Sequence, residues 1–148
     1  MISATYRDRP PCELVTLPWA YDDGGRAAAE PEFNLEDEIN DCVSRAIAIA
    51  TGRPYGEVYD MVDEFGRAAG FCAIACEGVP FELTAKLMSE LGWRYVPPHD
   101  ACLVTGQLPD EPRLIADMPG HCCAVIVGWC ATSTNARRGR TTMGGPRT

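Results

Sequence analysis

The chain has 148 residues, 46% of them hydrophobic, which predicts one globular domain with a core of its own. Its net charge of −8 argues against a general nucleic-acid binder. The longest apolar run, at residues 122–131, is shorter than the roughly 20 residues that a membrane helix needs. The opening segment MISATYRDRPPCELV lacks the pattern of a signal peptide, so we expect a cytoplasmic protein without a membrane partner.

The two ends of the chain differ in composition from its middle. Residues 1–33 are rich in Pro, Gly and acidic residues without sustained periodicity, which predicts a mainly irregular N-terminal arm. Residues 136–148 hold several arginines and no acid, which predicts a flexible basic tail. The folded domain is expected over residues 34–135, and nucleic acid is expected to bind only through the tail, if at all.

A run of acidic residues over 30–41 leads into the first predicted helix and is interpreted as a solvated face near its positive N-terminal end. Asn40 or Asp41 suits the N-cap and Gly52 suits the C-terminal stop, so this helix is expected over about 41–51. Its apolar stripe consists of Val43, Ala46, Ile47 and Ala50.

Two further helices are expected, each starting near a proline. One begins near Pro54 and ends before Gly70, and the other begins near Pro80 and ends at Gly92. Their apolar stripes are Tyr55, Val58, Tyr59, Val62 and Phe65 in the first, and Leu83, Leu87, Met88 and Leu91 in the second.

The pattern then becomes typical of strands. Short strands are expected at 93–96 and 113–117, a central strand at 121–129 and an edge strand at 141–143. Helices followed by strands predict the α+β class.

Eight cysteines are many for this length, and without a secretory signal they are expected to be thiols rather than disulfides. Cys72 and Cys76 are spaced to share a helix face, and with His99 and Cys12 they raise the alternative of a zinc site. Their spacing matches no common zinc module, so most of the cysteines are interpreted as small buried apolar residues.

Cys42 is expected in the first turn of its helix, where unpaired backbone N–H groups and the helix dipole stabilise a thiolate. By position alone, the better interpretation is one more packing thiol. A nucleophile also needs a base, and the chain has two histidines. His99 lies in a Pro-rich segment, whereas His121 begins the strongest predicted strand and could pair with a cysteine at a facing helix N-terminus. The alternative for His121 is a purely structural role.

The stretch NDCVSRAIAIATGRPYGEVYDMV resembles the opening motif of small papain-like cysteine-peptidase-like proteins of bacteriophages and prophages. Two later stretches, GVPFELTAKLMSELGWRYVP and LPDEPRLIADMPGHCCAVIVG, resemble further segments of the same family. The resemblance covers about residues 38–139. It implies a papain-like fold with N-terminal helices packed on a small antiparallel sheet, Cys42 as nucleophile and His121 as general base.

The resemblance also implies a residue that orients the imidazole. Relatives carry an aspartate just after the histidine strand, where this chain has Thr132, and the nearest amide, Asn135, is the candidate. The oxyanion hole would combine the backbone N–H of Cys42 with the side chain of Asn40, whose alternative role is to cap the helix.

These residues predict a phage-type cysteine hydrolase that cleaves a peptide, isopeptide or related amide bond without a cofactor or metal. Its expected partners are a protein or peptide substrate and other phage or host proteins, in the bacterial cytoplasm or the virion. Thr132 favours the alternative of a catalytically impaired relative that binds protein, as a virion component or a host-defence inhibitor. A zinc-binding structural module would need Cys72, Cys76 and a further pair to converge.

Overall fold

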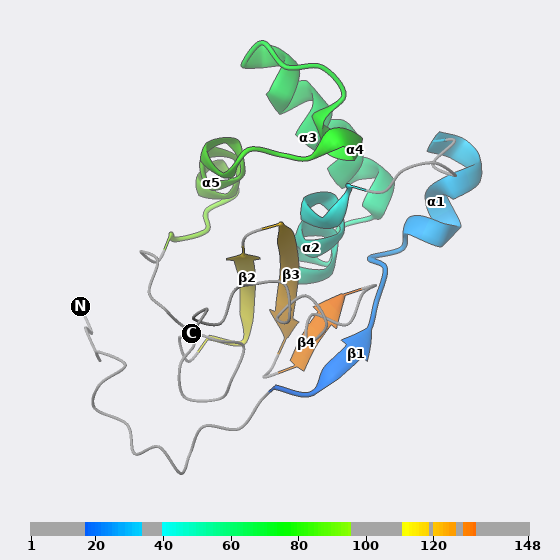
Figure 1. Ribbon diagram of the computed structural model, residues 1–148, viewed down its shortest axis with the longest axis vertical. Helices are drawn as coiled ribbons and strands as arrows, with labels where there is room; N and C mark the ends of the chain where they lie inside the picture. The colour runs from blue at the N-terminus through cyan, green and yellow to red at the C-terminus, as the bar shows by residue number, and fades with distance from the viewer. Residues whose placement is uncertain (1–16, 34–39, 96–110, 119, 127–128, 133–148) are drawn as a thin grey trace, which may run out of the picture.

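The computed structural model describes residues 17–33, 40–95, 111–118, 120–126 and 129–132. These ranges contain five helices and a four-stranded sheet, which confirms the α+β class. Figure 1 shows the helices gathered on one side of the sheet, with α2 nearest to the strands. The elements are β1 (Trp19–Tyr21), α1 (Arg26–Phe33), α2 (Cys42–Thr51), α3 (Tyr55–Ala68), α4 (Ile74–Glu77), α5 (Phe81–Glu90), β2 (Arg113–Met118), β3 (His121–Ile126) and β4 (Trp129–Thr132).

The sheet has the order β1-β4-β3-β2 and is mixed rather than antiparallel. The pairs β2/β3 and β3/β4 are antiparallel, but β1 runs parallel to β4, with Trp19 opposite Cys130 and Tyr21 opposite Thr132. The prediction of a purely antiparallel sheet is therefore wrong. A tight hairpin forces neighbouring strands to be antiparallel, whereas β1 comes from a distant part of the chain and is free of that constraint.

Residues 17–33 belong to the fold, so the prediction of an irregular arm is wrong for this part. Asp22 and Asp23 accept hydrogen bonds from the N–H groups of Gly24 and Gly25, and Asp23 also accepts one of 2.9 Å from Ala27 in the first turn of α1. The acids and glycines that read as a loop thus form a turn that starts a helix. Residues 1–16 lie outside the described residues, as does the basic tail at 136–148.

The three predicted helices are confirmed as α2, α3 and α5, with ends within one or two residues of those expected. α2 ends at Thr51 and is followed by Gly52, whose φ of 73° is the left-handed conformation expected of a C-terminal stop. Most residues of the apolar stripes belong to the main core, and each stripe residue of α2 is at most 6% exposed.

The strand predictions are partly correct. The strand at 113–117 is confirmed as β2, but residues 93–95 form no strand, and the ring of Tyr95 instead packs edge-on against that of Phe81. The stretch at 121–129 is not one strand, because β3 ends at Ile126 and β4 begins at Trp129. The helix α4 was not predicted, and the expected strand at 141–143 lies outside the described residues. Among the helices described here, none is long and apolar enough to cross a membrane.

Candidate active site

The helix α2 packs against β3. Its ten residues span about 15 Å, while the six residues of β3 span about 20 Å. At one end, Arg113, the strand partner of Ile126, donates a hydrogen bond of 3.0 Å from Nη1 to the carbonyl oxygen of Ala50. The C-terminal end of α2 therefore lies toward the end of β3, and Cys42, the first residue of α2, lies toward His121, the first residue of β3.

Electrostatic effects support this placement. Cys42 packs against the core cluster that contains Cys122. Burial raises the pKa of the Cys122 thiol, and the interaction with Cys42 raises it further. The pKa of His121 is lowered, first by burial and then by the positive charge of Arg45. Because Arg45 lies one turn after Cys42, the first turn of α2 and the start of β3 form one electrostatic environment.

The other predicted site residues are placed less fully. Asn40 is exposed at the entry to α2, and Asp41 rather than Asn40 occupies the N-cap position. Thr132 is the last residue of β4, while Asn135 lies outside the described residues. The elements of Cys42 and His121 therefore come together, and the roles of Asn40 and Asn135 stay predictions.

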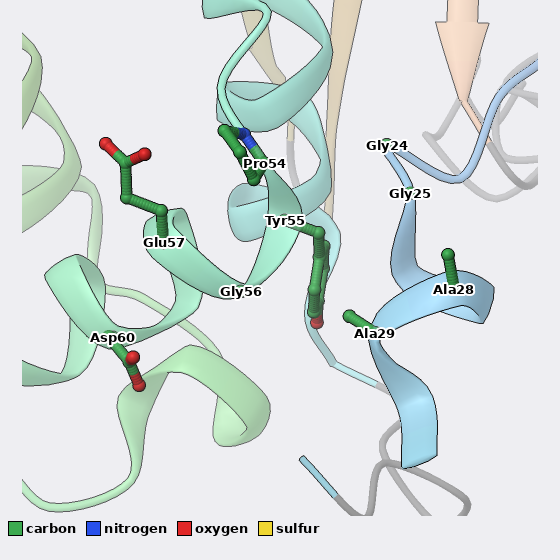
Figure 2. A pocket seen from close by; sticks show the side chains of 9 residues that line it. All are labelled: Gly24, Gly25, Ala28, Ala29, Pro54, Tyr55, Gly56, Glu57 and Asp60. Atoms are coloured by element: carbon green, nitrogen blue, oxygen red, sulfur yellow. The ribbon is translucent and has the colours of Figure 1, made fainter. Parts of the chain in front are cut away.

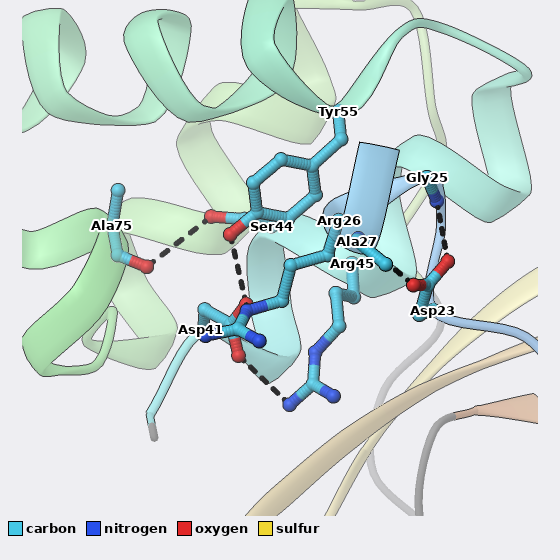
Figure 3. Close-up of polar contacts among 9 residues, drawn as sticks. All are labelled: Asp23, Gly25, Arg26, Ala27, Asp41, Ser44, Arg45, Tyr55 and Ala75. Carbon is cyan, nitrogen blue, oxygen red and sulfur yellow. Dashed lines mark hydrogen bonds and ion pairs between the residues drawn. The ribbon is translucent and has the colours of Figure 1, made fainter. Parts of the chain in front are cut away.

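Asp41 has a role that the sequence did not predict. It makes no capping hydrogen bond and is only 1% exposed, so the interpretation of a solvated acidic face is wrong for this residue. Its Oδ2 accepts a hydrogen bond of 2.8 Å from the Tyr55 hydroxyl and lies 2.9 Å from Nε of Arg26. Its Oδ1 lies 2.8 Å from Nη2 of Arg45 (Figure 3). Asp41 thus connects α1, α2 and α3 at the residue before Cys42.

The four side chains Arg26, Asp41, Arg45 and Tyr55, here called the Asp41 cluster, carry two positive charges and one negative charge. The Asp41 carboxylate holds both guanidiniums through ion pairs, one of 2.9 Å to Arg26 and one of 2.8 Å to Arg45. Burial, followed by the hydrogen bond to Asp41, raises the pKa of Tyr55, so its hydroxyl stays protonated as a donor. Such a cluster is costly to bury and depends on all its members.

Part of the Asp41 cluster was readable from sequence. Asp41 and Arg45 are four residues apart, a spacing that pairs opposite charges on one helix face. Arg26 and Tyr55 come from other helices, and no local pattern indicates that they meet Asp41. The missed signal was therefore the Asp-Cys-x-x-Arg spacing around the candidate nucleophile.

The six cysteines in the described ranges are all reduced. Cys122, Cys123 and Cys130 are buried, which confirms the packing interpretation for these three. The contact of 3.5 Å between Sγ of Cys123 and Sγ of Cys130, together with burial, raises the pKa of Cys123. Cys72 is exposed and precedes α4, so it does not share a helix face with Cys76. Within the described residues, no group of three or more His, Cys, Asp or Glu side chains could hold a metal ion.

A hollow of about 500 Å³ lies between α1 and the start of α3 (Figure 2). Its walls are mostly Gly, Ala and Pro54, and its carboxylates are Asp60 and Glu57, the latter ion-paired with Arg53. Tyr55 lines the hollow and also binds Asp41, so its ring forms a boundary between the hollow and the Asp41 cluster. Neither Cys42 nor His121 lines this hollow, which is therefore separate from the candidate active site.

No protein-family model matches the chain, and neither the curated proteins nor the solved structures include a significant match. The site therefore rests on its own geometry: a thiol at a helix N-terminus, an imidazole at the start of the adjoining strand, and a buried ionic cluster beside them.

Proposed function

We propose that the protein is a papain-like cysteine hydrolase that acts on a peptide, isopeptide or related amide bond. The observation that carries the proposal is the correspondence between the ends of α2 and β3, which brings the first residue of each element to the same end of the sheet. The resemblance of the Asn40–Val62 segment to phage cysteine-peptidase-like proteins supports the same conclusion.

In the proposed reaction, Sγ of Cys42 attacks the carbonyl carbon of the amide while its proton passes to the His121 imidazole. The C–N bond then breaks, and His121 gives that proton to the leaving amine. Water hydrolyses the resulting thioester with His121 as the base, which regenerates the thiol and releases a carboxylic acid. The lowered pKa of His121 favours the uncharged imidazole, the form that a base requires.

Backbone groups at the start of α2 are the proposed oxyanion hole. The Asp41 side chain makes no cap hydrogen bond, so it does not occupy the N–H groups of the first turn. These groups point toward the N-terminal end of the helix, where they would stabilise the negative oxygen of the tetrahedral intermediate. The exposed Asn40 amide is the proposed side-chain donor.

The test uses a panel of peptides that carry a thiol-reactive vinyl sulfone. We expect Cys42→Ala to abolish labelling, His121→Ala to slow it by about 10²–10⁴-fold, and Asn135→Ala to slow it less. Cys72→Ala, which removes an exposed thiol outside the site, should leave the labelling rate unchanged. Wild-type labelling in Asn135→Ala would remove that residue from the proposal and direct attention to Thr132.

The second candidate is a protein-binding module on the same fold, in a virion or as an inhibitor of host defence. The observation that favours it is Thr132 at the end of β4, where the resemblance implies an aspartate. Unchanged labelling in His121→Ala would leave Cys42 without its base and make this candidate the better one.

A further inference from the structure

The proposed reaction uses Cys42 and His121 but gives no role to the Asp41 cluster. Asp41 directly precedes Cys42, and Arg45 follows it by three residues on α2. Both side chains of this pair are largely removed from solvent, with 1% of Asp41 and 15% of Arg45 exposed. Charges buried so close to a candidate nucleophile carry a cost, and such costs concentrate at functional sites.

The position of the Arg45 guanidinium is fixed by its partner. Asp41 Oδ1 lies 2.8 Å from Nη2 of Arg45, and Asp41 is itself fixed by Tyr55 from α3 and by Arg26 from α1. Figure 3 shows these side chains converging on the Asp41 carboxylate from separate helices. Arg45 is therefore held in one place rather than free to move away.

Within the described residues, Nε of Arg45 is buried without a hydrogen-bond partner. A buried donor without a hydrogen bond costs stability. The salt bridge to Asp41 is made by Nη2, so it does not explain why Nε is left unsatisfied. This cost is understandable if the guanidinium is placed for its charge, because the cluster holds one more positive than negative charge.

We propose that Arg45 is a positioning residue of this site: the Asp41 carboxylate holds its guanidinium one helical turn after Cys42, at the end of α2 that lies toward His121, the first residue of β3. A positive charge held there favours the uncharged form of the imidazole. This inference rests on the proposed function for its catalytic meaning. The same positive charge also stabilises negative charge that develops on the sulfur or on the oxyanion.

Other charged and titratable groups belong to the elements that pack against β3. On α2 these are Cys42, Arg45 and the paired Asp41, and on β2 the exposed Asp117 lies next to Met118, the strand partner of His121. A carboxylate at Asp117 would favour the imidazolium, so its effect opposes that of Arg45. Burial and then the charge of Arg45 lower the pKa of His121, so the net effect of its surroundings is toward the uncharged imidazole.

The test is a proton NMR titration of the imidazole signals from pH 4.5 to 8.5. The chain has two histidines, and the signal lost in His121→Gln identifies that of His121. In the wild type we expect its midpoint below the ordinary value of about 6.5. Arg45→Gln should move the midpoint upward, whereas Arg45→Lys, which keeps the charge, should restore most of the wild-type value.

Arg53→Gln is the matched control, since it removes a guanidinium from an exposed pair with Glu57 and should leave the midpoint unchanged. An unshifted midpoint in folded Arg45→Gln overturns the inference, and so does a wild-type midpoint at or above about 6.5, which needs no variant to fold. The titration does not depend on turnover. If the midpoints shift as expected while His121→Ala keeps full probe labelling, the inference holds and the proposed function fails. If the midpoints do not shift while His121→Ala loses labelling, the proposed function holds and the inference fails.

Discussion

The hydroxyl of Tyr55 donates a buried hydrogen bond of 2.8 Å to Oδ2 of Asp41, which joins the first turn of α3 to the residue before Cys42. This bond explains why Tyr55 is only 2% exposed although it begins its helix. It also makes the start of α2 dependent on the packing of α3. The candidate nucleophile is thus supported by contacts made outside its own helix.

Tyr55→Phe should therefore destabilise the protein while keeping the aromatic packing. A hydrogen bond to a charged group contributes about 1.5–3 kcal/mol, and we expect a loss of that size in the free energy of unfolding by urea. Tyr95→Phe is the control, because Tyr95 is about half exposed and its ring contact with Phe81 does not need the hydroxyl. Equal effects of the two substitutions would contradict the role given to Tyr55.

Asp41→Asn should be more severe, because it leaves two guanidiniums without their shared negative partner. Removing one member of a buried ionic group costs about 3–5 kcal/mol. Glu57→Gln, which breaks an exposed ion pair, should cost about 0–1 kcal/mol and serves as the comparison. A loss for Asp41→Asn as small as that for Glu57→Gln in urea unfolding would show that the cluster is not a structural centre.

Stability should fall as the pH drops below about 6.5, the ordinary pKa of histidine. The pKa of His121 is lowered in the folded state, so the unfolded chain binds more protons in the interval between the folded and unfolded values. The free energy of unfolding then decreases with falling pH across that interval and is fully retained above it. His121→Gln should reduce this slope between pH 5 and 7 in urea titrations, and an identical slope in both proteins would contradict the prediction.

Cys42 should react before the other thiols with sub-stoichiometric iodoacetamide at neutral pH, because a helix N-terminus stabilises the thiolate. Burial raises the pKa of Cys122 and contributes to the raised pKa of Cys123, so these two should react last. The informative comparison is with Cys72, which is exposed but lies outside any helix, before the N-cap of α4. Peptide mass mapping that finds Cys72 labelled and Cys42 untouched would count against the site.

Gly66→Ala should destabilise α3 even though alanine favours helices. An added Cβ would come within 2.6 Å of Cγ1 of Ile74, a contact that forces the Ile74 side chain or the helices α3 and α4 to shift. We expect a loss of about 1–3 kcal/mol, reduced by at most about 1 kcal/mol of helix propensity. In the Ile74→Ala background, which lacks Cγ1 and Cδ1, the loss should shrink. Additive losses in this double-mutant cycle would place the strain elsewhere.

The helices were readable from the sequence because their signals are local. The stripe from Val43 to Ala50, followed by Gly52, carries both the periodicity and the stop of α2 within a few residues. The strand at 121–129 was misjudged because the sequence remains largely apolar from β3 into β4, with no polar residue to mark the end of the first strand. The direction of β1 was not readable at all, since its partner β4 lies at the other end of the domain.

The candidate site, too, could be predicted from the sequence only in part. Cys42 and His121 could be proposed from their places at the start of a helix and a strand, and the Asp41–Arg45 spacing was present but not used. Arg26 could not be found, because it lies in a segment without periodicity and reaches Asp41 only in the folded chain. Local patterns therefore identify the reacting groups but not the support behind them.

The parallel pairing of β1 with β4 has a consequence for how the chain folds. β1 is synthesised early but has no strand partner until β4 emerges, after nearly all of the described residues. Contacts between such distant segments close a long loop and slow folding relative to local helix formation. During that interval β1 and the nascent edge of β3 remain unpaired, which is the condition under which strands associate with other chains. Nascent chains that stop before residue 129 are therefore the form of this protein most exposed to aggregation.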